Sequence, residues 1–153
     1  MSQITVIKAG LRELDIVTIL FDEYRQFYKQ PKDVTACRKF LKERLQNEDS
    51  VILLALSEIN GEQSPAGFTQ LYPSFTSIGL NRTWILNDLF VNESSRRMGV
   101  ASSLLHAAKE YAVSLGAVRI SLETQKINSN AQKLYEKHSY MKDQDHFYYS
   151  LYL

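Results

Sequence analysis

The first half of the chain alternates between two hydrophobic periods, one typical of strands and one typical of helices. Residues 4–9 alternate apolar and polar side chains, which predicts a strand. Residues 11–28 carry apolar side chains every three or four positions, which predicts a helix that Pro31 ends. Asp33 is a typical N-cap for a second helix. The apolar stripe of that second helix contains Cys37, Phe40, Leu41 and Leu45.

A hairpin is predicted next. Residues 51–56 form a continuous apolar run, which indicates a buried strand. The dipeptide Asn60-Gly61 favours a tight hairpin turn. Residues 66–72 then predict the returning strand, which we expect Pro73 to end, and the polar residues 74–82 predict a loop.

The second half of the chain predicts three more strands, at residues 83–91, 118–124 and 146–152. Helices are predicted between them at residues 101–115 and 129–137, and Gly116 stands where the C-terminal cap of the first belongs. Helices that interrupt a mostly antiparallel set of strands indicate an α/β or α+β sheet with helices on its faces. The strand–helix–strand unit at 83–124 should be a right-handed parallel crossover.

Composition excludes several classes of function. The chain has 153 residues, the size of one domain, and a formal net charge of +1, which gives no case for binding nucleic acid or an anionic membrane surface. No signal peptide or membrane-length apolar run is visible, so the cytoplasm is the expected compartment. Cys37 is the only cysteine and fits a helix stripe better than a nucleophile's position. His106, His138 and His146 lack metal-ligand spacing, so we expect no metal.

One segment carries candidate chemistry. A buried strand ends at Val91, a short polar loop follows, and a helix then begins. The first N–H groups of a helix have no partner inside it, and the helix dipole adds positive potential there. Gly99 permits close approach of a ligand, and Arg96 and Arg97 add charge, so the segment predicts an anion site. The alternative is a plain helix start with two solvated arginines. The spacing matches neither a Walker loop nor the dinucleotide fingerprint.

Two motifs resemble those of the GNAT acetyltransferase superfamily. The run Arg96-Arg97-Met98-Gly99-Val100-Ala101 resembles its acetyl-CoA signature of Arg or Gln, two residues, Gly, one residue, then Gly or Ala. Residues 128–137, Asn-Ser-Asn-Ala-Gln-Lys-Leu-Tyr-Glu-Lys, resemble its Asn-x-x-Ala-x-x-Leu-Tyr-Glu-Lys helix. The order of elements also fits over nearly the whole chain. The resemblance implies a single N-acetyltransferase domain over residues 1–153, with a mixed, mostly antiparallel sheet of about six to seven strands and about four helices.

The resemblance also implies how acetyl-CoA binds. The backbone amides of residues 97–102 would hold the pyrophosphate, and the main chain of residues 89–91 would pair with the pantetheine arm, which requires this strand to splay from residues 118–124. Tyr135 would protonate the leaving thiolate, and Asn128 would bond the cofactor arm. The implied cofactor-binding residues are Leu89, Phe90, Val91, Arg96, Arg97, Met98, Gly99, Val100, Ala101, Ser102, Asn128 and Tyr135. Two departures from the family pattern, Arg97 for a frequent Gly and Ser139-Tyr140 for Gly-Phe, remove no backbone donor.

The catalytic base is less clearly indicated. Many family members carry a Glu at the position of Asn87, and an amide cannot act as a base. Asp88 is the nearest carboxylate, and desolvation in a buried strand would make it a stronger base. The base is therefore Asp88 or a water held by Asn87 and a tyrosine. The alternative is that Asp88 only bonds loop amides and fixes the geometry of the strand.

The acceptor site is expected around Tyr24, Arg25, Tyr28, Tyr72 and Asp88. Tyrosines near a carboxylate can hold an ammonium by cation–π contact. Alternatively, Arg25 pairs with a substrate carboxylate, which favours an amino acid or peptide. These residues favour direct transfer from acetyl-CoA to a primary amine of a small molecule.

Two other functions stay open. A protein lysine or N-terminus could be the acceptor, or the chain could be a catalytically weak CoA-binding module, which the amide of Asn87 would favour. The apolar residues 147–153 are expected to pair within the sheet or to form a homodimer contact.

Overall fold

The computed structural model describes residues 2–153, and these fall into two compact units. One unit runs to Glu123 and the other is Thr124–Leu153. The larger unit contains β1 (Gln3–Lys8), the short 3-10 helix η1 (Leu11–Glu13), α1 (Leu14–Phe27), α2 (Val34–Asn47), β2 (Val51–Ile59), β3 (Glu62–Thr76), β4 (Asn81–Val91), η2 (Glu93–Ser95), α3 (Val100–Ser114) and β5 (Ile120–Ser121). The smaller unit contains α4 (Ser129–Lys137).

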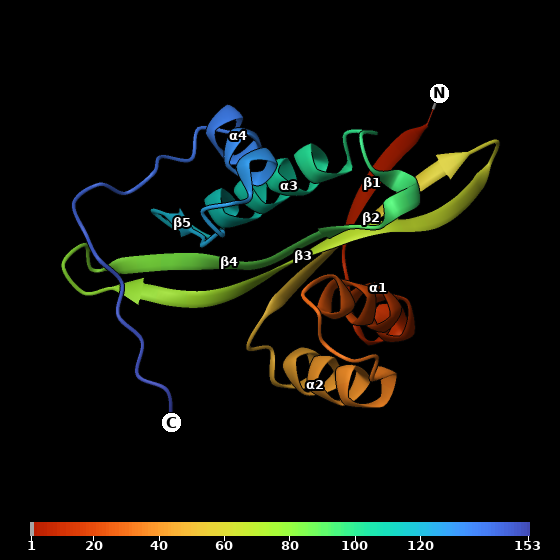
Figure 1. The fold of residues 1–153 in the computed structure, drawn as a ribbon, viewed down its shortest axis with the longest axis horizontal. Coiled ribbons are helices and arrows are strands. Elements are labelled where there is room, and N and C mark those ends of the chain that lie inside the picture. Colours follow the sequence, from red (N-terminus) through yellow and green to blue (C-terminus); the bar gives the residue numbers. More distant parts are fainter. Residues whose placement is uncertain (1) are drawn as a thin grey trace. The chain divides into compact units, whose positions relative to one another are not determined.

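The described strands form one sheet in the order β1-β2-β3-β4-β5. The first four are antiparallel neighbours, and β5 pairs with β4 in parallel. α1 and α2 cover one face of the sheet and α3 covers the other (Figure 1). The predicted mixed, mostly antiparallel α/β sheet and its parallel crossover are therefore confirmed, with five strands in the described residues instead of six to seven.

Several local predictions are also confirmed. The side chain of Asp33 accepts the N–H of Ala36 at 3.0 Å, as an N-cap does. Asn60 and Gly61 both have positive φ, 53° and 82°, which is the requirement of the hairpin turn between β2 and β3. Gly116, at φ 70°, follows α3 as its C-terminal cap.

The prediction that Pro73 ends a strand is wrong. β3 continues through Pro73, which pairs with Trp84, and most of the predicted loop at 74–82 is therefore strand. The ladder between β2 and β3 begins at the pair Val51 and Leu71, so at Pro73 only β4 lies beside β3. A proline is tolerated there because the missing N–H faces an edge without a ladder.

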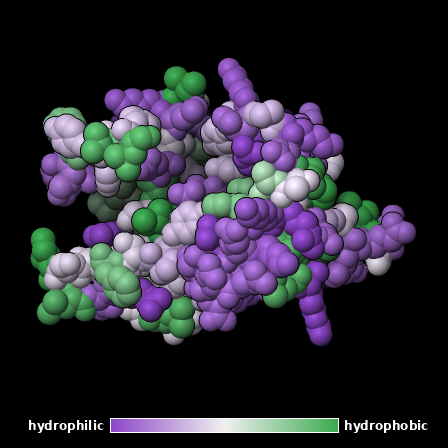
Figure 2. Space-filling view, turned by 90° about the horizontal axis from the view of Figure 1, so that it is seen from below, coloured by the Kyte–Doolittle hydropathy of each residue, from purple (hydrophilic) through white to green (hydrophobic). Residues whose placement is uncertain are grey.

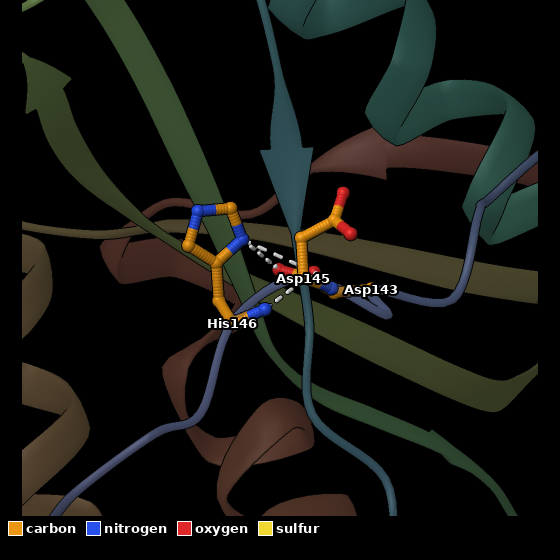
Figure 3. Close-up of polar contacts among 3 residues, drawn as sticks. All are labelled: Asp143, Asp145 and His146. Carbon is orange, nitrogen blue, oxygen red and sulfur yellow. Dashed lines mark hydrogen bonds and ion pairs between the residues drawn. The ribbon is translucent and has the colours of Figure 1, made fainter.

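The predicted strand at 118–124 is shorter than expected, and the one at 146–152 is wrong. Only Ile120–Ser121 join the sheet, and no strand is assigned in the described residues after α4. The carboxylate of Asp143 accepts the N–H groups of Asp145 and His146, at 2.8 and 3.1 Å (Figure 3). The N–H groups of Asp145 and His146 are thus committed to a turn where the predicted strand would begin.

The core lies on both faces of the sheet of the larger unit. α1 buries Val17, Leu20 and Phe21 in a cluster with residues of α2, β2, β3 and β4. On the other face, α3 buries Leu104 and Leu105. On the surface drawn in Figure 2, hydrophilic residues predominate and hydrophobic residues form separate small patches.

Gly67 is required by the close pairing of β3 with β4. A Cβ added at this position would overlap the carbonyl oxygen of Phe90 and lie 3.2 Å from the Cα of Val91. We expect Gly67→Ala to lower the free energy of unfolding by about 1–3 kcal/mol, because the backbone of β4 must shift. Differential scanning calorimetry should show a fall in Tm of roughly 3–10 °C.

Gly10→Ala is the matched control. A Cβ at Gly10 would meet only Glu13 Oε2, at an ordinary 3.7 Å. Its Tm should stay near the wild-type value, and equal Tm values for the two variants would contradict the packing argument.

Candidate active site

A β-bulge in β4 sets the geometry of the candidate acceptor site. Gln70 pairs with Asp88, but the next residue of β3, Leu71, pairs with Leu86. Asn87 is therefore an extra residue on β4, and a bulge of this kind redirects the side chains around it. Asp88 is buried, with 4% of its surface exposed, while Asn87 is exposed.

Side-chain donors from β3 and β4 hold the carboxylate of Asp88. Gln70 Nε2 of β3 donates to Asp88 Oδ2 at 2.7 Å, and Asn87 Nδ2 of β4 donates to Oδ1 at 3.1 Å. The hydroxyl of Tyr24 in α1 lies close enough for the charge of Asp88 to raise its pKa. A buried carboxylate held in this way has the charge and orientation to receive a cation.

Tyr24 and Tyr72 lie close to this carboxylate, and Tyr28 packs against Tyr24. The rings of Tyr24 and Tyr28 pack edge to face, with centroids 5.1 Å apart. Burial, followed by the charge of Asp88, raises the pKa of Tyr24 far above its ordinary value and raises the pKa of Tyr72 to about 12. Both phenols therefore stay neutral near neutral pH, where they can donate hydrogen bonds and present their ring faces.

Arg25 points elsewhere. Its Nη1 lies 3.7 Å from the sulfur of Cys37 in α2, so the guanidinium sits at the contact between α1 and α2. The prediction that Cys37 belongs to the core is confirmed, because only 2% of its surface is exposed. Burial raises the pKa of this thiol, which does not suit a nucleophile. The predicted contact of Arg25 with a substrate carboxylate stays a prediction.

One edge of β4 has the splay that the sequence predicts. β4 pairs with β5 only at Trp84 with Ile120 and at Ile85 with Ser121. Beyond Ile85 the ladder of β4 with β5 ends, although the pairing with β3 continues to Val91. Strand residues without a ladder on one side can pair with an extended ligand.

The loop after β4 is tied to β3. The side chain of Asn92 accepts the N–H of Ser95 at 3.0 Å and donates to the carbonyl of Pro65 at 2.8 Å. The chain then turns sharply, because Arg97 and Gly99 both adopt left-handed conformations, with φ of 63° and 81°. Glycine tolerates that conformation without cost, whereas Arg97 is strained, as residues at ligand sites often are.

The helix start that follows fits a pyrophosphate. The N–H of Ser103 bonds the carbonyl of Gly99 at 3.0 Å, so the amides of Val100 and Ala101 precede the regular hydrogen bonds of α3. An added Cβ at Gly99 would meet nothing within 4 Å, so the surface there is open to a ligand. Arg96 donates to the carbonyl of Val91 at 3.3 Å and lies over the ring of Phe27. The charge and donors suit an anion.

The smaller unit carries the second predicted motif as a helix. Asn128 is the N-cap of α4, and its side-chain oxygen accepts the N–H of Ala131 at 3.2 Å. The amide nitrogen of Asn128 and the second lone pair of its oxygen could still bind a ligand. The rings of Tyr135 and Tyr140 pack with centroids 5.8 Å apart.

Gln70 was not predicted as a site residue. A polar side chain within the apolar segment Phe68-Thr69-Gln70-Leu71 is the same signal that pointed to Asp88 in β4, and it could have identified Gln70.

Neither a metal site nor a membrane span is found in residues 2–153. No group of three or more His, Cys, Asp or Glu side chains among them is arranged to hold a metal ion. None of their helices combines the length and apolar content that crossing a bilayer requires.

Comparison with known proteins identifies the family. Residues 15–140 match the model of the acetyltransferase (GNAT) family. The chain belongs to the GNAT acetyltransferase family. It is 47% identical to the uncharacterized N-acetyltransferase YhfO of Bacillus subtilis (strain 168) over 132 residues, which cover 86% of each chain.

Solved GNAT structures agree with this assignment. A crystal structure of a probable acetyltransferase has a TM-score of 0.90 and 42% identity, and the match covers 97% of each chain. The GNAT relatives make the chain an acyltransferase enzyme, and enzymes of this family use acetyl-CoA as cosubstrate. A ribosomal-protein-alanine N-acetyltransferase from Brucella melitensis biovar Abortus 2308 is only 17% identical but has a TM-score of 0.77, over 97% of this chain and 100% of that one. The GNAT fold alone therefore does not select the acceptor.

Gly99→Ala should weaken CoA binding. The added methyl group would lie at the open start of α3, where a phosphate must approach the backbone closely. We expect the Kd for CoA to rise about tenfold, which corresponds to about 1.4 kcal/mol, in isothermal titration calorimetry.

Gly61→Ala is the matched control, because Gly61 has φ of 82° and equally open surroundings, but lies in the hairpin turn of β2 and β3. Both variants should lose about 1–2 kcal/mol of stability through backbone strain. Only Gly99→Ala should change the Kd for CoA. Equal Kd values for Gly99→Ala and Gly61→Ala would show that the start of α3 is not part of the cosubstrate site.

Proposed function

We propose that this enzyme transfers the acetyl group of acetyl-CoA to a primary amine of a small molecule, with Asp88 at the centre of the acceptor site. The observation that carries the proposal is the buried, hydrogen-bonded carboxylate of Asp88 beside Tyr24 and Tyr72. The low exposure of Asp88, 4%, favours a slender acceptor group, such as an amine at the end of an alkyl chain. A folded protein surface fits such a position less well.

The cosubstrate would occupy the splayed edge of β4 and the start of α3. The main chain of Leu89–Val91 would pair with the pantetheine arm, and the amides of residues 97–102 would hold the pyrophosphate. Asn128 would bond the arm through its amide nitrogen. These roles rest on the family motifs together with the end of the β4–β5 ladder after Ile85.

Asp88 would receive the acceptor amine as an ammonium ion. An alkyl ammonium has a pKa near 10, so it enters charged at neutral pH. The carboxylate attracts it, and the faces of Tyr24 and Tyr72 add cation–π stabilisation. Because both phenols stay neutral, they add no competing charge. Asp88, or a water held by Asn87 and a tyrosine, then accepts the proton and exposes the nitrogen lone pair.

Acetyl-CoA supplies the activated acetyl group as a thioester. The amine nitrogen forms a bond to the acetyl carbon as the bond from that carbon to sulfur breaks, and the hydroxyl of Tyr135 gives its proton to the leaving thiolate. We further propose that residues 1–153 act as one N-acetyltransferase domain and that the apolar residues 147–153 contribute to a homodimer.

Binding of acetyl-CoA and transfer to amines test the proposal directly. Acetyl-CoA at about a hundred times its Kd should raise the Tm by about 5–10 °C, and ATP and NAD should not. Free-thiol detection of CoA should then show turnover with small primary amines such as diamines, polyamines or amino acids. Turnover with peptides only would assign the acceptor to proteins. Stabilisation without any turnover would leave a CoA-binding module.

One variant tests the carboxylate of the proposed acceptor site, and another tests the proposed acid. Asp88→Asn and Tyr135→Phe should each lower kcat/KM for the amine by about 10²–10⁴-fold, because each removes a proton-transfer group. Both should keep the thermal shift with acetyl-CoA. Tyr111→Phe makes the same chemical change as Tyr135→Phe in α3, keeps the ring that packs on Trp84, and should retain wild-type turnover. Unchanged turnover in Tyr135→Phe would reject its role as the acid.

A further inference from the structure

Gln70 stands out as a buried polar side chain that no step above requires. It lies in β3 with none of its surface exposed, directly across the ladder from Asp88. Neighbouring apolar residues, Phe68 and Leu71, are also fully buried. An apolar residue at position 70 would therefore suit the packing, and the amide has to be explained by what it contacts.

The nitrogen and the oxygen of the Gln70 side-chain amide differ in their hydrogen bonding. Its Nε2 donates to Asp88 Oδ2 at 2.7 Å, a shorter hydrogen bond than the 3.1 Å bond from Asn87 to Oδ1. The Gln70 side chain also lowers the pKa of Tyr72, which partly offsets the rise that burial causes. Its Oε1, in contrast, is buried and has no hydrogen-bond partner among the described residues. A buried acceptor without a partner destabilises the fold, so stability alone does not account for this amide.

We propose that Gln70 is a positioning residue of the acceptor site, which fixes the orientation of the Asp88 carboxylate by its hydrogen bond to Oδ2. This inference rests on the proposed function of Asp88. Gln70 does not itself receive the proton. It fixes the rotation of the Asp88 side chain through Oδ2, while Asn87 holds Oδ1, so one orientation of the carboxylate faces the incoming ammonium.

Loss of the Gln70 hydrogen bond should change the pH dependence of the reaction. A hydrogen bond to the ionised carboxylate opposes its protonation, so without Gln70 the carboxylate of Asp88 should be protonated at higher pH. The titratable and charged groups that face this cluster are Tyr24 and Tyr28 from α1 and Tyr72 from β3. Arg44 and Asp49 lie near enough to affect the pKa of Tyr72.

Gln70→Met tests the role, because methionine is similar in size but donates no hydrogen bond. The acid limb of the pH profile of kcat/KM for the amine should move to higher pH by about one unit, the effect of one hydrogen bond to a charged group. The KM for acetyl-CoA should not change. Gln70→Glu should move the limb further, because two carboxylates at this distance share one proton.

Ser57→Ala is the control for the loss of a buried polar group. Ser57 is 2% exposed and bonds Ser64, in the ladder between β2 and β3. This variant should leave the acid limb at its wild-type pH. Circular dichroism should establish that Gln70→Met and Gln70→Glu are folded. If either folded variant keeps the acid limb of its pH profile at the wild-type pH, the inference is wrong.

A second measurement keeps the test independent of turnover. Carbon-13 NMR of the Asp88 carboxyl signal should show protonation at higher pH in Gln70→Met than in the wild type. If Asp88→Asn keeps wild-type turnover, the proposed acceptor site is wrong. If Asp88→Asn loses turnover while the NMR titration of Gln70→Met matches the wild type, only the role of Gln70 is wrong.

Discussion

Strand β4 has two edges with different hydrogen bonding, and the candidate site depends on that difference. On one edge β4 pairs with β3 from Asn81 to Val91, which fixes it firmly in the sheet. On the other edge its ladder with β5 covers only Trp84 and Ile85. Backbone groups that lose a ladder must find water or a ligand. The same strand can therefore be rigid and still offer main-chain groups to an extended cosubstrate.

The bulge at Asn87 and the aromatic packing of α1 bring the acceptor side to this strand. The bulge lets Asn87 reach the carboxylate of its neighbour, Asp88. The ring of Tyr24 packs against Phe68 and Phe90, at centroid distances of 5.8 and 6.1 Å, so burial of α1 also places the Tyr24 hydroxyl at Asp88. Packing that stabilises the fold thus also orders the polar groups of the site.

The fold could be predicted largely from the sequence. Hydrophobic periodicity, the cap at Asp33 and the turn at Asn60-Gly61 are local signals, and the structure confirms the elements they predict. Predictions that depended on which strands and side chains lie beside a segment were less accurate. Pro73 lies inside a strand because β2 does not extend beside it, and Asp143 takes the N–H groups of Asp145 and His146 in a turn where the predicted last strand would begin.

The sequence by itself determined the family and the position of the candidate anion site, since the motifs around Gly99 and within residues 128–137 consist of nearly consecutive residues. Only the tertiary structure decided which side chains surround Asp88. Tyr24, Gln70 and Asp88 lie on α1, β3 and β4, and no local pattern relates three such elements. Register and helix docking bring them together, and both are set by packing across the whole sheet.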